Sequence, residues 1–172
     1  MADERRKVAF VDIDGTLVDT QERYNMCLQE VGANSLDELR GERRSAFWNC
    51  FQSKKYMNLD KPNWRVINYV NNLKRLGFKI KVLSGRMESQ REATIDQLAR
   101  YGVQYDELIL RKDNDFRKDY EYKGEIILDH VRQGWEVIVI DDSKAVRDVY
   151  PEGSYDPNNL PDPLSLYASK LK

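Results

Sequence analysis

The chain has 172 residues, of which 41% are hydrophobic, so it is long enough to bury the core of one domain. Charged residues make up 33% of the chain, but 28 lysines and arginines are balanced by 29 aspartates and glutamates. This balance excludes a global basic field that attracts nucleic acid, so a polyanion must bind at a local patch. No apolar run approaches the roughly 20 residues that span a bilayer, and we expect a soluble protein that binds no membrane.

The N-terminal segment and the cysteines bear on the compartment. The segment MADERRK has no apolar stretch that could act as a signal peptide. The only cysteines, Cys27 and Cys50, lie in a segment with a helical pattern. These features together favour the reducing cytoplasm.

The first predicted element is a strand at residues 8–13, a β-branched and nearly all-apolar run. Such a run suits a central strand that helices bury on both faces. Residues 20–58 follow, with helical patterns at about 21–31 and 36–54, several aromatic residues and no strand. We interpret this segment as a small helical cap inserted after the first strand.

From residue 64 onward, helical patterns alternate with short apolar runs. Helices are predicted at 64–76, 88–101 and 122–132, and strands at 78–83, 105–110 and 135–140. A glycine follows each helical pattern, as expected for a C-terminal cap. The tail from 151 to 163 is rich in Pro, Asn, Asp and Gly, which predicts an irregular surface segment.

The order of these elements predicts the fold class. Strands that alternate with helices form βαβ units with right-handed crossovers and a mostly parallel sheet. We expect a single α/β domain over residues 1–172, a Rossmann-like three-layer sandwich with helices on both faces of the sheet. In an open sheet of this kind, ligands bind outside the carboxyl ends of the strands.

Polar side chains gather at those predicted strand ends. Asp12 and Asp14 end the first strand, and Ser84 follows the second. Asp141 and Asp142 follow the last strand. A carboxylate at the end of an apolar strand is costly to desolvate unless it is paired or binds a metal. Because the candidate ligands are oxygens, without a cluster of Cys or His, the crevice favours Mg²⁺ over zinc.

The spacing of Asp12 and Asp14 predicts phosphoryl chemistry. Gly15 lets the chain turn at the strand end, so both carboxylates can face one phosphorus. An ionised carboxylate attacks phosphorus to form an aspartyl-phosphate, while a second carboxyl protonates the leaving oxygen and then activates water. Ser84 is expected to open a helix whose backbone amides bind phosphate oxygens. Lys123 is expected to begin the helix before the last strand and to reach the same crevice.

Four segments of the chain resemble the motifs of the haloacid dehalogenase (HAD) superfamily of phosphohydrolases. They are VDIDGTLVD at 11–19, VLSGR at 82–86, a lysine at 123 and VIDDS at 139–143. The resemblance covers most of the chain and implies Asp12 as nucleophile and Asp14 as general acid and base. The residues that it implies for phosphate binding are Thr16, Ser84, Gly85 and Lys123, and those for Mg²⁺ are Asp12, the Asp14 carbonyl, Asp141 and Asp142.

A narrower resemblance joins SGR at 84–86 to LRKDNDFRKDYEYKGEII at 110–127. This stretch is similar to the 3′-phosphatase domain of bacteriophage polynucleotide kinase-phosphatase, where an RxxxDxRxD pattern precedes the lysine. Arginine forks suit phosphate oxygens. The resemblance implies Arg86, Arg111 and Arg117 as phosphate-site arginines, with Asp119 in a supporting role. Asp115 is an alternative orienting partner.

Two features depart from that domain. The chain has no GxxxxGK[ST] loop, so no kinase half is predicted. The substrate arginine that the family carries after its first motif has no clear match, and Arg43 and Arg44 in the expected cap are its candidates.

We therefore predict a Mg²⁺-dependent phosphatase that acts on a phosphomonoester. The first hypothesis is a 3′-phosphatase of nucleic acid ends or 3′-nucleotides, as in nucleic acid end repair. The second is a phosphatase of free nucleotides or other small phosphomonoesters. A third is a non-enzymatic phosphate-binding or receiver-type module, but Asp14 argues against it, since a long-lived phosphoaspartate needs no general acid.

Overall fold

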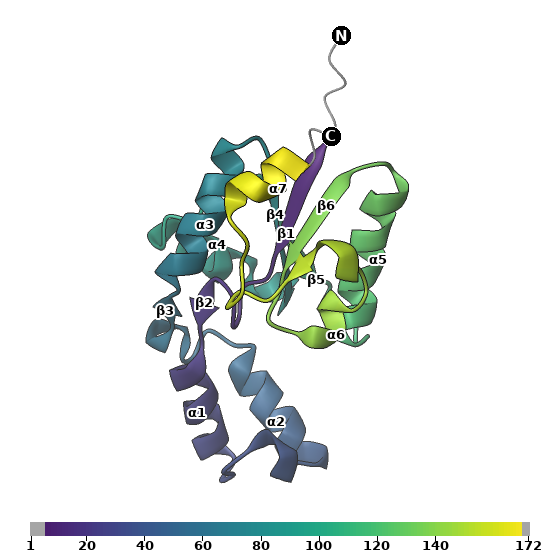
Figure 1. Cartoon of the computed structure of the whole chain (residues 1–172). Coiled ribbons are helices and arrows are strands. Elements are labelled where there is room, and N and C mark those ends of the chain that lie inside the picture. The colour runs from purple at the N-terminus through teal and green to yellow at the C-terminus, as the bar shows by residue number, and fades with distance from the viewer. Residues whose placement is uncertain (1–5, 170–172) are drawn as a thin grey trace.

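A parallel sheet forms the centre of the computed structural model, which describes residues 6–169 (Figure 1). Within those residues the sheet has five strands in the order β5-β4-β1-β6-β7, and every neighbouring pair is parallel. The predicted α/β fold with a mostly parallel sheet is confirmed. The strands are β1 (Lys7–Val11), β4 (Lys79–Met87), β5 (Glu107–Arg111), β6 (Glu136–Ile140) and β7 (Ser154–Tyr155).

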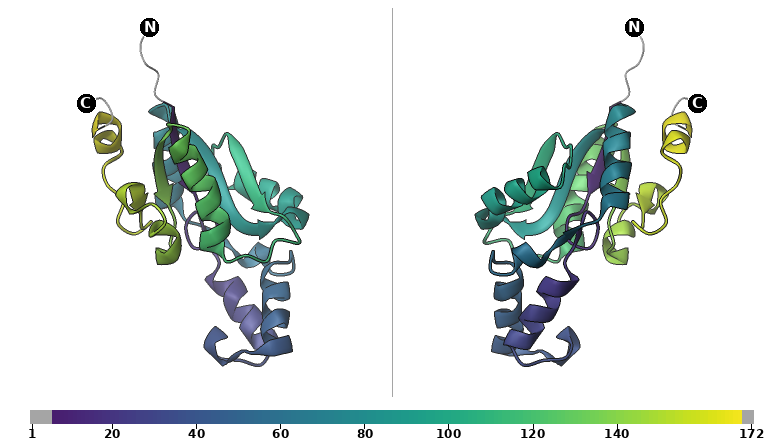
Figure 2. Two further views of the ribbon diagram at one scale, coloured as in Figure 1. Left: turned by 90° about the vertical axis from the view of Figure 1, so that its right-hand side faces the viewer. Right: turned by 90° about the vertical axis from the view of Figure 1, so that its left-hand side faces the viewer.

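Helices cover both faces of the sheet, as Figure 2 shows. Alternate residues of β1 point to opposite faces, so Ala9 and Val11 pack in one core cluster, and Val8 and Phe10 pack in another. The first cluster lies against α3 (Trp64–Arg75) and α4 (Arg91–Arg100), and the second against α5 (Asp119–Arg132) and α6 (Lys144–Arg147). This burial on both faces explains why β1 is almost entirely apolar.

A pair of helices projects from the carboxyl edge of the sheet (Figures 1 and 2). They are α1 (Gln21–Glu30) and α2 (Gly41–Phe51), and a two-stranded antiparallel ribbon of β2 (Val18–Asp19) and β3 (Lys61–Pro62) carries the chain out and back. We call α1, α2 and the turns between them the helical pair. It has its own core, made of Cys27, Leu28, Leu39, Phe47 and Cys50.

The predicted helix at 36–54 is divided in the structure. Residues Leu36–Glu38 form a short 3₁₀ helix, η1, which is separate from α2. A second 3₁₀ helix, η2, follows α2 at Met57–Leu59, after the predicted range. Arg40 has an extended backbone, with φ −139° and ψ 155°, and α2 begins at the next residue. The break turns Leu39 into the core of the helical pair, where it is fully buried.

A disulfide joins Cys27 of α1 to Cys50 of α2, whose Cα atoms lie 5.7 Å apart. The sequence pattern places these cysteines in a helical segment and, with the N-terminal segment, favours a reducing compartment; it does not predict their pairing. They are 23 positions apart in the sequence, and only the packing of α1 against α2 brings them together.

Reduction of this disulfide is expected to lower the stability of the protein. Closing a loop of this length restricts the unfolded chain, which is worth about 3 kcal/mol and corresponds to a melting temperature lower by about 6–12 °C. Thermal unfolding with and without dithiothreitol measures the effect, with a Cys27→Ser/Cys50→Ser variant as the control that no longer responds. An equal melting temperature in both conditions would contradict it.

Two predicted element boundaries near the strand ends are wrong. Strand β4 continues through Ser84 to Met87, because Met87 pairs with Arg111 of β5 after a register shift. Ser84 therefore lies in a strand and opens no helix; the next helical turn is η3 (Glu88–Gln90). Helix α5 begins at Asp119, so Lys123 lies in its second turn, not at its start.

The tail after α6 is more regular than its composition suggests. Residues Pro151–Gly153 form η4, and β7 then pairs with β6 at the edge of the sheet. Tyr155 packs against the main core cluster, which explains why this segment is ordered against the domain. Helix α7 (Pro163–Ser169) follows. Across residues 6–169, none of the helices has the length and apolar character of a membrane span.

Candidate active site

A cleft of about 810 Å³ opens at the carboxyl edge of the sheet, with the helical pair contributing part of its wall. Side chains from the ends of β1, β4 and β6, from the loop before α5 and from α2 line it. Of the predicted site residues, the cleft brings together Asp12, Asp14, Gly85, Arg86, Arg111, Arg117, Asp119, Lys123, Asp141 and Asp142.

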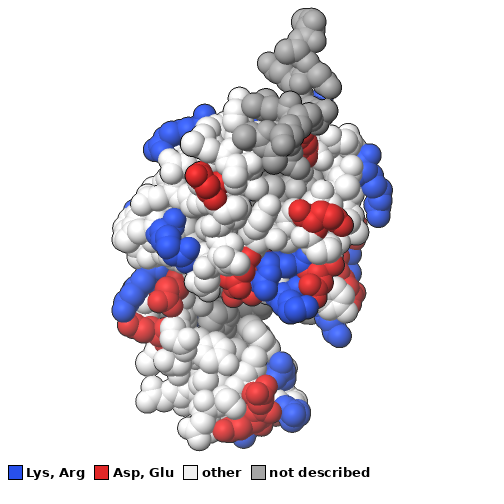
Figure 3. Space-filling view, in the orientation of Figure 1, with Lys and Arg blue, Asp and Glu red and all other residues white. Residues whose placement is uncertain are grey.

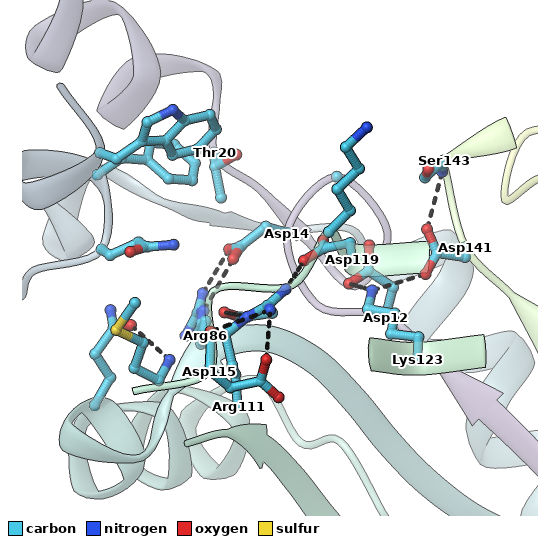
Figure 4. Close-up of a pocket in the computed structure, with 18 of the residues that line it drawn as sticks. Asp12, Asp14, Thr20, Arg86, Arg111, Asp115, Asp119, Lys123, Asp141 and Ser143 are labelled. Carbon is cyan, nitrogen blue, oxygen red and sulfur yellow. Dashed lines mark hydrogen bonds and ion pairs between the residues drawn. The ribbon is translucent and has the colours of Figure 1, made fainter. Parts of the chain in front are cut away.

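Three carboxylates gather at the base of this cleft. Among the described residues, Asp12, Asp141 and Asp142 each place one oxygen within 4.8 Å of the others. The Nζ atom of Lys123 lies 3.0 Å from Asp12 Oδ1 and 2.8 Å from Asp141 Oδ2 (Figure 4). Ser143 N donates to Asp141 Oδ1 at 2.9 Å. The lysine therefore holds the carboxylates of β1 and β6 side by side.

The electrostatics of the cluster favour a bound cation. Burial, together with the charge of Asp141, raises the pKa of Asp12 well above its ordinary value, and burial also raises the pKa of Asp142. Burial alone would lower the pKa of Lys123, but the charges of Asp12 and Asp141 raise it. One lysine cannot neutralise all three acids, and their oxygen ligands suit a hard divalent ion.

Asp14 points away from this cluster toward Arg86 (Figure 4). Arg86 binds it with two nitrogens, Nη2 to Oδ1 at 2.8 Å and Nε to Oδ2 at 3.1 Å. Arg23 Nη2 lies 2.7 Å from Asp14 Oδ1. Although burial opposes it, the charges and hydrogen bonds of Arg86 and then Arg23 lower the pKa of Asp14 to about 2. In this arrangement Asp14 is ionised at neutral pH and has no proton to donate.

Arg23 is a site residue that the sequence analysis did not find. Its side chain is fully buried, with Nε 3.1 Å from Asp60 Oδ1 and Nη1 donating to the Phe51 carbonyl at 2.8 Å. The available signal was its place one turn before Cys27 on the buried face of α1, where an arginine needs partners.

Of the two arginines proposed from the sequence, Arg44 lines the cleft and Arg43 does not. Arg43 is exposed and donates to the carbonyls of Val31 and Gly32. Arg44 donates to the Leu36 carbonyl, although it also lines the cleft. It is Arg23, and not Arg43, that contacts Asp14, because its position on α1 faces the end of β1.

Two glycines allow the acidic side chains to come close to the backbone. Gly15 has a φ of 85°, and a Cβ atom there would lie 2.2 Å from Asp142 Oδ2. A Cβ atom on Gly85 would lie 2.7 Å from Asp119 Oδ1. At Gly15 the positive φ and the close Asp142 carboxylate both favour glycine, whereas a side chain at Gly85 would have to displace the Asp119 carboxylate.

Thr16 and Ser84 are both buried beside the cluster. The Thr16 hydroxyl donates to Asp12 Oδ2 at 3.3 Å, and so helps to fix the carboxylate that Lys123 also binds. The Ser84 hydroxyl accepts a hydrogen bond from Arg86 N at 3.0 Å. Both hydroxyls thus support Asp12 and Arg86, two side chains that line the cleft.

Arg111 and Arg117 lie in the cleft wall, but their guanidinium groups already bind acceptors of the chain. Arg111 donates to Asp119, to the Arg117 carbonyl at 2.6 Å and to the Gly85 carbonyl at 3.4 Å. Arg117 Nη2 lies 2.8 Å from Asp115 Oδ2, and hydrogen bonds from Arg117 lower the pKa of Asp115 to about 2. The wall before α5 is therefore a network of charged hydrogen bonds.

The low pKa of Asp14 predicts a pH dependence of stability. A carboxyl whose pKa falls from 3.8 to about 2 on folding stabilises the fold above its unfolded pKa. The contribution, on the order of 2 kcal/mol, is lost as the pH falls from about 4 toward 2. We expect Asp14→Asn to be less stable than wild type at neutral pH, with the difference shrinking over that range. Urea unfolding at a series of pH values measures this, and a constant difference would contradict it.

The comparisons with known proteins agree with this geometry. Residues 42–152, more than half of the chain, match the family model for the phosphatase domain of polynucleotide kinase PNKP. The chain belongs to this family of HAD phosphatase domains. It is therefore a phosphatase, and the receiver-type alternative is excluded. The matched range begins after Asp12 and Asp14 and includes the residues from Ser84 to Asp142.

Solved structures support the same assignment. The chain shares 26% identity with a chain in a structure of the Pnkp1/Rnl/Hen1 complex, with a TM-score of 0.63. The superposition covers 90% of this chain and 46% of the chain in that complex. A haloacid dehalogenase-like hydrolase from Streptococcus pneumoniae is 16% identical, with a TM-score of 0.62 over 86% of this chain and 81% of that one, and shows the fold alone. The chain spans less than half the length of the Pnkp1 complex chain. No protein of curated function matches it by sequence.

Proposed function

We propose that this phosphatase is Mg²⁺-dependent and removes a 3′-phosphate from a nucleic acid end or a nucleotide through an aspartyl-phosphate on Asp12. The observation that carries the proposal is the buried Asp12 carboxylate, which binds Lys123 and lies beside the acids that follow β6. The 3′ specificity is supported by the family match and by the likeness to a chain of a structure described as an RNA repair complex, at 26% identity.

The side chains of the cleft divide the chemical steps among them. Asp12 attacks phosphorus, the bond to the leaving oxygen breaks, and Asp14 supplies the proton for that oxygen. Water then attacks the aspartyl-phosphate, and Asp14 accepts its proton. Lys123 offsets charge on the phosphoryl oxygens throughout.

The arginine pair sets the protonation of Asp14. Phosphoryl oxygens that accept hydrogen bonds from Arg86 and Arg23 compete with Asp14 for the same donors. Because those donors lower the pKa of Asp14 to about 2, losing them raises it and allows the carboxyl to hold a proton. Asp14 thus becomes an acid when the substrate is bound.

The acidic cluster is the proposed magnesium site. Asp12, the Asp14 carbonyl, Asp141 and Asp142 would hold Mg²⁺, which would neutralise phosphoryl charge and lower the repulsion against the attacking carboxylate. The raised pKa values of Asp12 and Asp142 support a cation there, since a cation would relieve the crowding of negative charge.

Removal of Mg²⁺ is expected to reduce the rate of phosphate release at least about a hundredfold, with recovery when Mg²⁺ is restored. Asp141→Asn and Asp142→Asn should each need more Mg²⁺ for half-maximal activity. Asp129→Asn, an exposed carboxylate on α5, is the matched control. Full activity in excess chelator would count against the site.

The preference for a 3′-phosphate is tested on matched mononucleotides. We expect kcat/KM for a 3′-mononucleotide to exceed that for its 5′ isomer at least about tenfold, because groups on fixed elements favour one orientation of the substrate. Arg117→Lys keeps the charge but loses the planar fork that binds Asp115, and should weaken this preference. Equal rates on both isomers would favour the second candidate, a general phosphatase of nucleotides and small phosphomonoesters.

The helical pair is proposed to serve as a cap within a single domain of residues 1–172. Arg44, Trp48, Phe51 and Gln52 of this region line the cleft next to the catalytic acids. On the face shown in Figure 3, basic and acidic side chains are interspersed, which agrees with recognition at the cleft rather than along a broad basic surface. A cytoplasmic location stays a prediction from the sequence.

A further inference from the structure

Phe116 lies in the cleft wall with its ring in solvent. Among the exposed large hydrophobic side chains of residues 6–169, Phe116 has the highest exposed fraction, 85%. It belongs to the loop between β5 and α5 and lines the cleft beside Arg117 and Asp119. A single exposed hydrophobic residue is ordinary on a protein surface, so its meaning depends on how it is held.

The backbone on both sides of Phe116 is fixed by charged hydrogen bonds. Arg111 Nη1 donates to the carbonyl of Arg117 at 2.6 Å and to that of Asp115 at 3.4 Å. Asp115 Oδ1 in turn accepts from Arg117 N at 3.1 Å and from Arg117 Nε at 3.0 Å. These bonds fix the backbone on both sides of Phe116, so a ligand would have to order only the rotamer of its side chain.

Arg111 also connects this loop, through hydrogen bonds, to the end of β4 at the proposed phosphoryl site. Arg111 Nε donates to the Gly85 carbonyl at 3.4 Å, and Arg111 also binds Asp119, which lies against Gly85. The next residue of β4 is Arg86, which binds Asp14. Arg111 thus connects the loop that carries Phe116 to the strand end that carries Arg86, an arginine proposed to bind the phosphoryl group.

Trp48 is a second aromatic residue in the cleft, contributed by α2. Its ring packs edge-on against Phe47 at 5.0 Å and Phe51 at 5.9 Å, between centroids, and so is also held in place. Arg44 and Lys118 line the cleft near these two residues in the sequence. Aromatic rings with cationic groups beside them are the combination that binds the bases and backbone of single-stranded nucleic acid.

We propose that Phe116 and Trp48 form a stacking subsite for the nucleobase of the nucleotide that carries the phosphate to be removed. The subsite rests on the proposed function, and adds that the enzyme recognises the base itself. Because every base has a π face, the subsite would bind any of the bases. It would add no binding energy for a sugar phosphate that has no base.

The test compares oligonucleotide 3′-phosphates that differ only in their last residue, a normal nucleotide or an abasic one. We expect kcat/KM to be roughly tenfold higher for the base-bearing substrate, as stacking of one base would provide. Phe116→Leu and Trp48→Leu should bring that ratio close to one, and Phe116→Tyr should keep it. Trp64→Leu is the matched control, since Trp64 is a half-exposed aromatic on α3 that is not among the residues lining the cleft.

The outcomes separate the two proposals. Release from both substrates at equal rates in wild type, or a ratio that Phe116→Leu leaves unchanged, would overturn the subsite while the 3′-phosphatase function stands. Release from neither substrate would overturn the proposed function, and the subsite with it. Because Phe116 is exposed, the Phe116→Leu variant is expected to fold even if Trp48→Leu does not.

Discussion

Asp12→Asn is expected to lower phosphate release at least about a thousandfold, which is the loss expected when a covalent nucleophile is removed. The amide nearly keeps the shape of the carboxylate and the contact with Lys123, but it has no charged oxygen with which to attack phosphorus. The protein should stay folded, because burial and Asp141 already raise the pKa of Asp12 and so disfavour its charge. A melting temperature equal to or above that of wild type is the expected companion result.

A second measurement makes this prediction specific to the covalent step. Wild-type enzyme quenched during turnover should carry one phosphoryl group that mass spectrometry locates on Asp12, and Asp12→Asn should carry none. Asp129→Asn on the surface of α5 serves as the matched control and should behave as wild type. A wild-type rate in the Asp12 variant would rule out the aspartyl-phosphate.

Among the substitutions considered, Arg23→Met is expected to lower the free energy of unfolding most, by about 3–5 kcal/mol. The reason is that Asp14 and Asp60 lose the arginine that pairs with them. The guanidinium binds Asp14, Asp60 and the Phe51 carbonyl at once, so it joins α1 to α2, β1 and the start of β3. The Cζ atom of Arg23 also lies 4.5 Å from the centroid of the Phe51 ring. Asp60 already has a raised pKa owing to burial, and the loss of Arg23 removes the charge that opposes this effect.

Chemical denaturation measures this loss, and Arg43→Met is the matched control. Arg43 has the same side chain on the same helical pair but is exposed and binds only the carbonyls of Val31 and Gly32. Arg23→Lys should fall between wild type and Arg23→Met, because an ammonium keeps the charge but cannot span all these acceptors. An Arg23→Met variant as stable as the control would contradict the assignment.

The sheet and the acids at its edge could be predicted from local patterns in the sequence. The apolar run of β1 has one stable placement, in the middle of a sheet covered on both faces, and Asp12 and Asp14 directly follow it. Since the carboxyl ends of parallel strands meet at one edge, the acids after β6 had to join them. The family motifs agree because they are local patterns of the same strand ends.

The contacts of these acids depend on the completed fold. Asp14 was expected to face the substrate, yet two arginines hold it, one from α1 and one from the end of β4. The partners of Arg23 and the pairing of Cys27 with Cys50 have no local signal, because Asp60 and Phe51 lie far from Arg23 in the sequence and Cys50 lies far from Cys27. The extension of β4 to Met87 depends likewise on its pairing with β5.

The same distinction holds for the arginines before α5. The RxxxDxRxD pattern identifies Arg111 and Arg117 from the sequence, but it does not tell which acceptors their forks bind. That choice depends on the close approach of Asp119 to Gly85 and on the path of the loop around Phe116. Periodicity and motif spacing act over a few neighbouring residues, whereas a buried charge is stabilised by whichever groups the completed fold brings within hydrogen-bonding distance.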